Sequence, residues 1–279
     1  MEQHAERMGD WVENRSTHGA RALHLRQLWA YRELIGFLAI RDLKVRYKQA
    51  LFGIGWTVLQ PLAGAVAFTL LFRQLADVPS DGIPYPAFAF CGFAVWSYVS
   101  SSVTTARASL ITNVPLITKV YFPRLCLPLA SVLPSLVDLA GALVFLAAMM
   151  AWYRIRPGIA VLAAPVFLLE AVVVAFGTST FFATLSVQYR DVQQVFALLV
   201  QLWLFASPVA YPSSLVHGAW RWVYALNPMA GVLEGTRWAL LNGPPPGKTA
   251  LASAASAGLI LVVGLLAFQR AERRFADVI

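Results

Sequence analysis

Charged residues are scarce in this chain. Aspartate, glutamate, lysine and arginine make up 13% of its 279 residues, whereas hydrophobic residues make up 58%. Soluble domains are about 25% charged and about 45–50% apolar, because a shell that faces water needs charge. The composition therefore argues against a soluble enzyme, and the same abundance of apolar residues excludes disorder for most of the length.

Histidine and cysteine are scarce as well. The four histidines all lie outside the long apolar stretches, so no imidazole is placed within a bilayer for metal-assisted or acid–base catalysis. The two cysteines, Cys91 and Cys126, show no metal-ligand spacing and are expected to be small buried apolar residues. We expect no metal site and no catalytic residue in this chain.

Six long apolar stretches predict an all-α integral membrane protein, since about 20 apolar residues cross a bilayer core about 30 Å thick. A seventh apolar patch, Trp222–Leu233, has twelve residues and is interrupted by a turn signal at Asn227-Pro228. We expect outer re-entrant half-helices there, between spans five and six, although an ordinary amphipathic loop helix fits the same pattern. The transmembrane domain is expected over residues 53–270, with spans at about 53–72, 86–106, 126–150, 160–185, 193–213 and 249–269.

The basic residues predict the orientation. The chain has 22 lysines and arginines against 14 acidic residues, and most of these cations lie on one side of the six-span arrangement. Such a bias places both termini in the cytoplasm and accounts for the net charge of +8 without nucleic acid as a partner. Residues 1–26 are mixed-charge and lack the apolar segment of a signal peptide, so we expect a flexible cytoplasmic N-terminus. Residues 271–279 form the expected cytoplasmic tail.

Residues 27–52 predict an amphipathic helix and its basic flank. Apolar residues recur at helical spacing on one side, and four cations follow directly before the first span. This pattern is typical of a helix that lies in the inner membrane interface, and a plain basic flank would carry the same cations. The apolar side comprises Leu28, Tyr31, Leu34, Ile35 and Leu38, and the cations are Arg41, Lys44, Arg46 and Lys48.

Two carboxylates lie inside the predicted spans, Asp138 in the third and Glu170 in the fourth. Ionisable residues at membrane depth are functional candidates, and each can also serve as a hydrogen-bonding partner for a neighbouring helix. The last span carries Ala250, Ala254 and Gly258 at four-residue spacing. That spacing permits close helix packing, either within one copy or between copies.

The segment Gly243–Thr249 is similar to a phosphate-binding loop. Its spacing is one residue short, and its three prolines lack the backbone N–H groups that would cradle a phosphate. We therefore expect no nucleotide site in this chain.

Four segments resemble one family of membrane proteins, the permease subunits of type 2 ABC exporters for bacterial surface polysaccharides such as O-antigen, capsule and teichoic acid. The similarity covers roughly residues 27–270, and the four segments follow one another in the family's order. They are RDLKVRYKQALFGIGWTVLQPL from Arg41, NVPLITKVYFPR at Asn113–Arg124, QYRDVQQV at Gln188–Val195, and YALNPMAGVLEGTRWALL at Tyr224–Leu241.

The resemblance implies that the chain is one half of a pore in the bacterial cytoplasmic (inner) membrane. Two copies would pair among membrane lipids, and each would dock one cytoplasmic ATPase subunit that carries ATP and magnesium. The substrate would be a lipid-linked glycan moved from the inner to the outer side. A type 2 exporter of a drug or lipid, or a proton-coupled flippase, remains an alternative.

The same resemblance suggests which residues take part. Residues expected to contact the ATPase subunit are Asn113, Leu116, Ile117, Lys119, Val120, Phe122, Arg124, Arg190 and Asp191. An outer gate is expected at Asn227, Pro228, Glu234 and Arg237. There Asn227 would cap a helix that starts at Pro228, and Glu234 would pair with Arg237 three residues away. Aromatic candidates for lining a channel are Trp96, Tyr98, Trp203, Phe205, Tyr211 and Tyr224.

Overall fold

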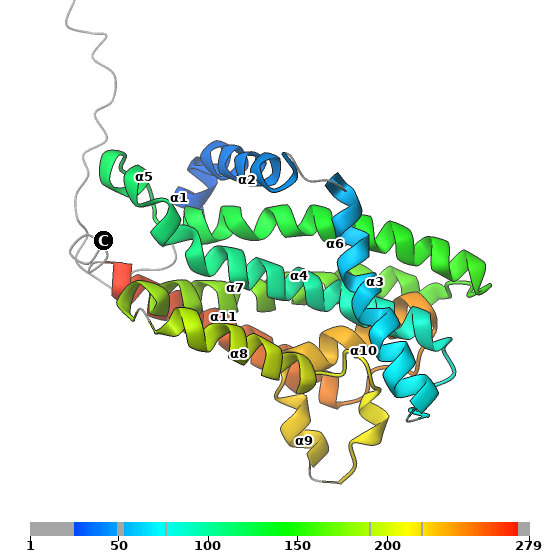
Figure 1. Ribbon diagram of the computed structural model, residues 1–279. Coiled ribbons are helices and arrows are strands. Elements are labelled where there is room, and N and C mark those ends of the chain that lie inside the picture. Colours follow the sequence, from blue (N-terminus) through cyan, green and yellow to red (C-terminus); the bar gives the residue numbers. More distant parts are fainter. Residues whose placement is uncertain (1–24, 49–52, 76, 190, 219, 273–279) are drawn as a thin grey trace, which may run out of the picture.

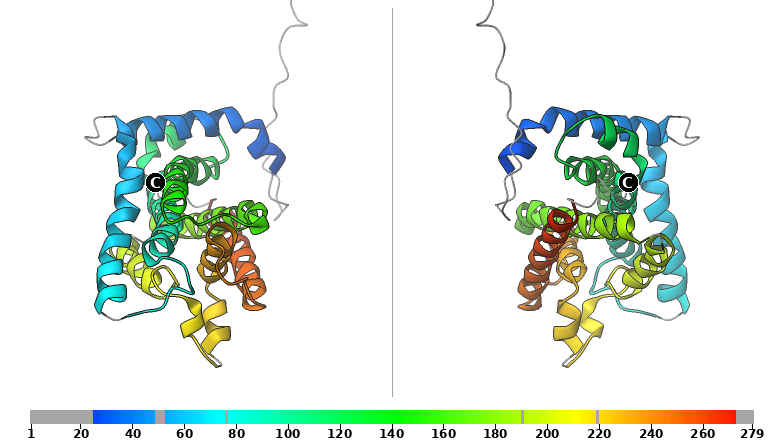
Figure 2. Two further views of the ribbon diagram at one scale, coloured as in Figure 1. Left: turned by 90° about the vertical axis from the view of Figure 1, so that its right-hand side faces the viewer. Right: turned by 90° about the vertical axis from the view of Figure 1, so that its left-hand side faces the viewer.

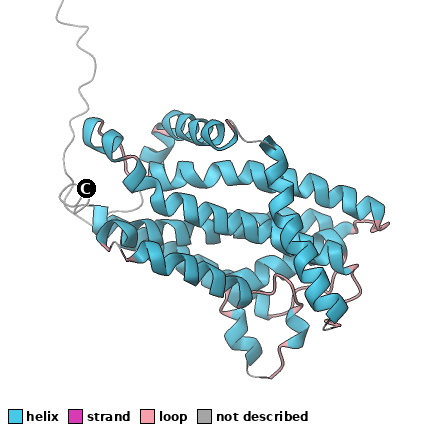
Figure 3. Cartoon of the chain, in the orientation of Figure 1, coloured by secondary structure: helices cyan, strands magenta, loops and turns pink. Residues whose placement is uncertain are grey.

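A computed structural model describes residues 25–48, 53–75, 77–189, 191–218 and 220–272. The described residues form helices and loops without a strand (Figures 1 and 3), so the predicted all-α membrane fold is confirmed. The helices are α1 (Leu25–Ala30), α2 (Arg32–Tyr47), α3 (Trp56–Phe68), α4 (Tyr85–Thr112), α5 (Val114–Lys119), α6 (Cys126–Trp152), α7 (Ala164–Gln188), α8 (Val192–Phe205), α9 (Trp220–Ala225), α10 (Pro228–Leu241) and α11 (Thr249–Glu272).

Helix α4 is the central element of the bundle. It packs against α3, α6, α7 and α10. In its most apolar stretch 78% of the residues are buried, whereas the share is 17% in the stretch Trp56–Arg73 that contains α3. Small residues such as Ala87, Ala89 and Gly92 let these neighbours approach its backbone. Because α4 has 28 residues, it is about 42 Å long and exceeds the hydrocarbon core of a bilayer.

Five of the six predicted spans have helices long and apolar enough to cross a membrane: Trp56–Arg73, Tyr85–Thr112, Cys126–Trp152, Ile159–Gln188 and Thr249–Glu272. The fifth predicted span, 193–213, differs. Helix α8 ends at Phe205 after 14 residues, so it is about 21 Å long and too short to cross alone. Pro208 and Pro212 follow in an irregular segment, since proline has no N–H to continue a helix.

Helix α2 lies across the long helices α4 and α6, as the turned views show (Figure 2). Its predicted apolar side is confirmed: Ile35 and Leu38 are buried, and Leu28, Tyr31 and Leu34 pack beside them. The partner of this side is the protein's own inner core, which includes Cys126, Leu127 and Phe268. A second apolar surface on the two N-terminal helices is exposed instead, and it comprises Trp29, Phe37, Ile40 and Val45.

Helices α7 and α11 approach each other at glycines. A Cβ atom built on Gly264 would lie 2.2 Å from the carbonyl oxygen of Gly177, and one built on Gly177 would lie 2.7 Å from the backbone of Leu261. The contact therefore does not use the stripe that the sequence suggested, because a Cβ built on Gly258 has no atom within 4 Å and Ala254 is exposed.

This packing predicts opposite outcomes for two glycines of one helix. Gly264→Ala forces the backbones of α7 and α11 apart and should cost about 1–3 kcal/mol of stability. Gly258→Ala is the matched control, since its new methyl group meets open space and should be neutral or slightly stabilising. The measurement is the thermal midpoint of the purified protein in detergent, and equal midpoints for the two variants would disprove the α7–α11 contact.

Candidate functional site

The irregular segment after α8 is the candidate functional site. Residues 207–210 are buried and lie beyond the end of α8. Their backbone carbonyl groups therefore do not take part in the regular hydrogen bonds of a helix. Water does not reach such groups in lipid or in a protein interior, so each carbonyl oxygen needs a hydrogen-bond donor from another part of the chain.

Side chains from α4, from the residue before α10 and from α10 itself supply donors, and two hydroxyl groups of the segment add others. Tyr85 at the start of α4 donates through Oη to the Ala210 carbonyl at 2.6 Å. Asn227 donates through Nδ2 to the Ala206 carbonyl at 3.0 Å. Within the segment itself, the Tyr211 hydroxyl donates to the Phe205 carbonyl at 2.8 Å and the Ser207 hydroxyl to the Trp203 carbonyl at 2.7 Å. The sequence did not predict this contact of Tyr85, because the acceptor lies 125 residues further along the chain.

Arg237 of α10 provides the strongest contact of this kind. Its side chain is buried, and it donates to the carbonyl groups of Pro208 and Val209 at 2.5 Å and of Phe88 at 3.3 Å. The guanidinium carbon also lies 3.6 Å from the centroid of the Phe88 ring, a cation–π contact. Gly92 leaves room for this arrangement, because a Cβ atom there would lie 2.2 Å from the Val209 carbonyl oxygen.

The predicted ion pair between Glu234 and Arg237 is therefore wrong. The two residues share a helix face, but the guanidinium turns toward the carbonyl groups after α8, and the structure has no ion pair between these two described residues. Three carbonyl oxygens on a buried cation satisfy its donors without a second charge at membrane depth.

Asn227 caps α10, as the sequence predicted. Its Oδ1 accepts from the N–H of Met229 at 3.1 Å, and Pro228 occupies the first helical position. The same oxygen accepts from Trp203 Nε1 at 3.0 Å, so one side chain starts α10 and holds the end of α8. The predicted break at Asn227-Pro228 is also confirmed, because α9 ends at Ala225 and α10 begins after Asn227.

The aromatic candidates for lining a channel differ in how deeply they are buried. Trp96 and Tyr98 are buried within the described chain, so they do not line a channel in this conformation, and Trp96 packs edge-on against Trp203 with centroids 5.4 Å apart. Phe205 is exposed. Tyr211 and Tyr224 are half-buried, and the Tyr224 hydroxyl donates to the Tyr211 hydroxyl at 3.1 Å, next to the segment after α8.

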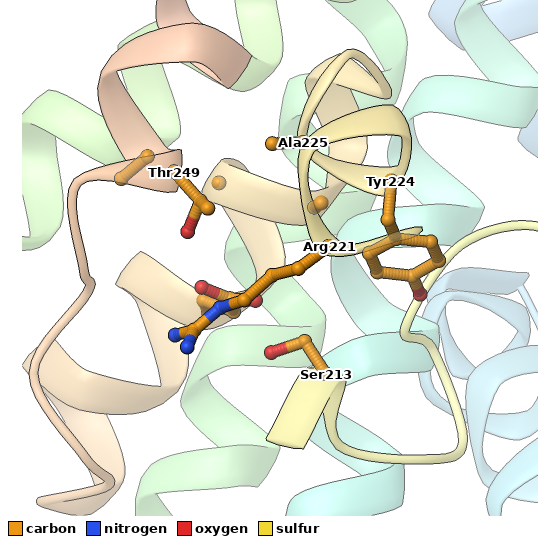
Figure 4. A pocket seen from close by; sticks show the side chains of 9 residues that line it. Ser213, Arg221, Tyr224, Ala225 and Thr249 are labelled. Carbon is orange, nitrogen blue, oxygen red and sulfur yellow. The ribbon is translucent and has the colours of Figure 1, made fainter. Parts of the chain in front are cut away.

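Two hollows flank this site. One is small, about 10 Å³, which is room for about one water molecule; Arg221 extends into it between Ser213 and Thr249 (Figure 4). The other has a volume of about 440 Å³ and a mostly apolar wall made by Trp203, Trp220, Val223, Tyr224 and Ile260, among others.

Asp138, near the middle of α6, has partners from α2. Arg46 forms an ion pair with it, and the Tyr47 hydroxyl donates to its other oxygen. Arg46 also donates to the Thr105 hydroxyl of α4 at 3.2 Å. Burial, and then the hydrogen bond to Asp138, raise the pKa of Tyr47 above its usual value, so the phenol stays a donor. Asp138 thus joins the interfacial helix to two long helices, whereas Glu170 keeps a buried oxygen without a partner among the described residues.

Two of the four cations before the first span have partners within the protein, and the other two are exposed. Arg41 and Arg46 are engaged within the protein, and Arg41 donates to Asp42 at 2.8 Å and to the Asn113 side chain at 2.9 Å. Lys44 and Lys48 are exposed and remain available to lipid headgroups.

The segment expected to contact an ATPase subunit is only partly available to a partner. Helix α5 projects at the end of the bundle near α1 (Figure 1). Asn113 and Phe122 are buried in the protein's own core, so this conformation does not present them to a partner. Leu116, Ile117 and Arg124 are half-buried, Lys119, Val120 and Asp191 are exposed, and Arg190 lies outside the described residues. Tyr121, which the sequence analysis did not single out, is the most exposed aromatic residue in this segment.

These features define a class of protein: a multi-pass helical membrane protein with a short broken helix pair and a crosswise N-terminal helix. The chain belongs to the ABC-2 type transporter family, whose model matches residues 33–241. Membership makes it a membrane permease, not an enzyme, and implies an ATPase as its partner.

Curated relatives agree over nearly the whole chain. The chain is 28% identical over 248 residues to an "O-antigen export system permease protein RfbA" of Klebsiella pneumoniae, with 88% of this chain and 95% of the relative covered. A protein of the same name from Myxococcus xanthus is 29% identical over 259 residues, with 91% and 98% covered.

The contacts of Arg237 predict that replacing Arg237 lowers the thermal stability, whereas replacing its neighbour Glu234 does not. Arg237→Gln removes the cation from three buried carbonyl groups, and each unsatisfied group costs about 1–3 kcal/mol, so the thermal midpoint of the purified protein should fall strongly. Glu234→Gln is the matched control and should leave the midpoint unchanged, because no ion pair is lost. Equal destabilisation by both variants would indicate that the two charges do pair.

Proposed function

We propose that two copies of this chain form the membrane conduit of an ATP-driven exporter that moves a lipid-linked polysaccharide from the cytoplasmic to the outer side of the cytoplasmic membrane. The printed names of the relatives, O-antigen export permeases, support the substrate class. The excess of lysine and arginine on one side supports cytoplasmic termini.

The observation that carries the conduit is the polarity of the least buried helices. Gln60 on α3 and Gln194 and Gln201 on α8 are exposed, within surfaces that are otherwise apolar. An amide side chain turned toward lipid costs several kcal/mol without a partner, so these faces are better suited to a second copy or to a water-filled path. The two helices are close, since the rings of Phe68 on α3 and Phe205 on α8 lie 6.3 Å apart.

Coupling to the ATPase fits the inner end of the bundle. Lys119, Val120 and Tyr121 are exposed at the end of α5 and just beyond it, and exposed apolar side chains on a compact projection favour a protein partner. The sequence leads us to expect no nucleotide site in this chain, so the proposal assigns ATP hydrolysis to the partner subunit.

A cysteine cross-link tests the pairing of two copies. Leu202→Cys, on the exposed side of α8, should give an oxidised dimer in membranes, because identical helices meet across a two-fold axis. Leu259→Cys on α11 is the control, since it is exposed to a similar degree on another helix and should stay monomeric. The native Cys91 and Cys126 are buried and give little background. Cross-linking at Leu259 and not at Leu202 would place the pairing on another surface.

The substrate is tested in cells that lack this chain. They should retain the lipid-linked glycan on the cytoplasmic side and lose it from the surface, and only the chain together with its ATPase should restore export. Normal surface glycan in the deletion strain would reject the polysaccharide and favour a drug or lipid as cargo. Restoration of export without the ATPase would favour a proton-coupled flippase.

A further inference from the structure

One cation of the bundle has no partner in the part of the chain that the structure describes. Arg107, near the end of α4, makes no ion pair or hydrogen bond with a described residue, and its Nε atom is buried. Arg46 and Arg237 differ, because one pairs with Asp138 and the other with three carbonyl groups. Its two terminal nitrogens are not among the buried atoms, so they can donate to an acceptor supplied from outside the chain.

A ring of α8 holds this guanidinium in place. The central carbon of Arg107 lies 4.7 Å from the centroid of the Phe196 ring, within the range of a cation–π contact. Phe196 is itself buried and packs edge-on against Phe182 of α7, with centroids 5.0 Å apart. The side chain therefore lies at a seam between α4 and α8, with its planar fork fixed by stacking.

The depth of Arg107 in the membrane limits what the acceptor is. Helix α4 is about 42 Å long and a hydrocarbon core about 30 Å thick, so about 6 Å of the helix extends beyond the core at each end. Arg107 is five residues from the end at Thr112, or about 7.5 Å along the helix axis. Its Cα atom would therefore lie about 1.5 Å inside the core, and its long side chain can extend outward to the level of the lipid phosphate groups, on the inner side according to the distribution of basic residues.

We propose that Arg107 binds a phosphate group carried by a membrane lipid, at the inner end of the seam between α4 and α8. A planar guanidinium offers two parallel N–H donors that match two phosphate oxygens. The phosphate belongs either to a bulk anionic phospholipid or to a phosphorylated polyprenol of the kind that carries glycans, and the second source rests on the function proposed above. Such a contact would place the charged part of a lipid beside α8, the helix assigned to the conduit.

Lipid retention by the purified chain tests this proposal. The wild-type protein and its variants are placed in nanodiscs of phosphatidylcholine that contain a trace of labelled polyprenyl phosphate or of labelled phosphatidylglycerol. Arg107→Gln should lower retention about tenfold, the loss expected for one charge-assisted contact, and Arg107→Lys should fall between the two. Arg32→Gln is the matched control, since Arg32 also lies over an aromatic ring, that of Trp29, on the exposed side of α2, and it should retain as much as wild type.

Each outcome has one meaning. A loss for both lipids supports a site for any lipid phosphate, and a loss for only one of them supports the proposal and identifies that lipid as the source. Equal retention by Arg107→Gln and wild type for both lipids, or an equal loss in Arg32→Gln, would overturn it. If Arg107→Gln is not recovered folded, the wild-type protein is compared with labelled polyprenol, the uncharged alcohol, and equal retention of alcohol and phosphate overturns the proposal.

This assay is independent of transport, because it uses neither ATP nor glycan. Failure of the deletion strain to lose surface glycan would reject the polysaccharide substrate and leave the phosphate site standing. Unchanged retention in Arg107→Gln would reject the phosphate site and leave the exporter standing.

Discussion

The carbonyl groups released where α8 ends are the constraint on which the packing of α4, α8 and α10 depends. In water such groups would be solvated, but at membrane depth each must find a donor within the protein. Arg237, Asn227 and Tyr85 supply donors from α10, from its cap and from α4. Because one buried cation serves three carbonyl groups, the end of α8, the start of α10 and the central helix hold one another in place.

In a second part of the bundle, a charged pair joins helices that are distant in the sequence. Arg46 and Tyr47 of α2 both contact Asp138 of α6, and Arg46 also contacts Thr105 of α4. Helix α4 thus contacts the Asp138 network through Thr105 and the Arg237 contacts through Phe88 and Gly92. One helix therefore joins the two sets of polar contacts.

The sequence predicted the features that depend on local pattern. Apolar length predicted six spans, of which five have helices long enough to cross a membrane. Helical spacing predicted the buried side of α2, and the Asn227-Pro228 pair predicted both a helix start and its cap. The features it missed are contacts between residues far apart in the chain. Asp138 lies 92 residues from Arg46, and Arg237 lies 28 residues from Val209. Helical periodicity contains no information on such distant pairs, so the neighbour Glu234 was the best partner that local spacing offered for Arg237. The length of α8 was missed for a related reason: residues 193–213 carry no charge that would interrupt a span. The irregular end is stabilised by its own Ser207 and Tyr211 hydroxyls and by distant donors, which local spacing does not reveal.

The central claim is that α8 ends at Phe205 and that the following segment is held by Arg237 beside the conduit. A cysteine scan of the assembled exporter with a small water-soluble thiol reagent tests it most directly. Positions 198, 202 and 205 should react, because they lie on the exposed side of α8, whereas positions 209 and 212 should be protected, because they are buried after the helix ends. A continuous helix would place 198, 202, 205, 209 and 212 on one side, so reaction at all five positions would contradict this account.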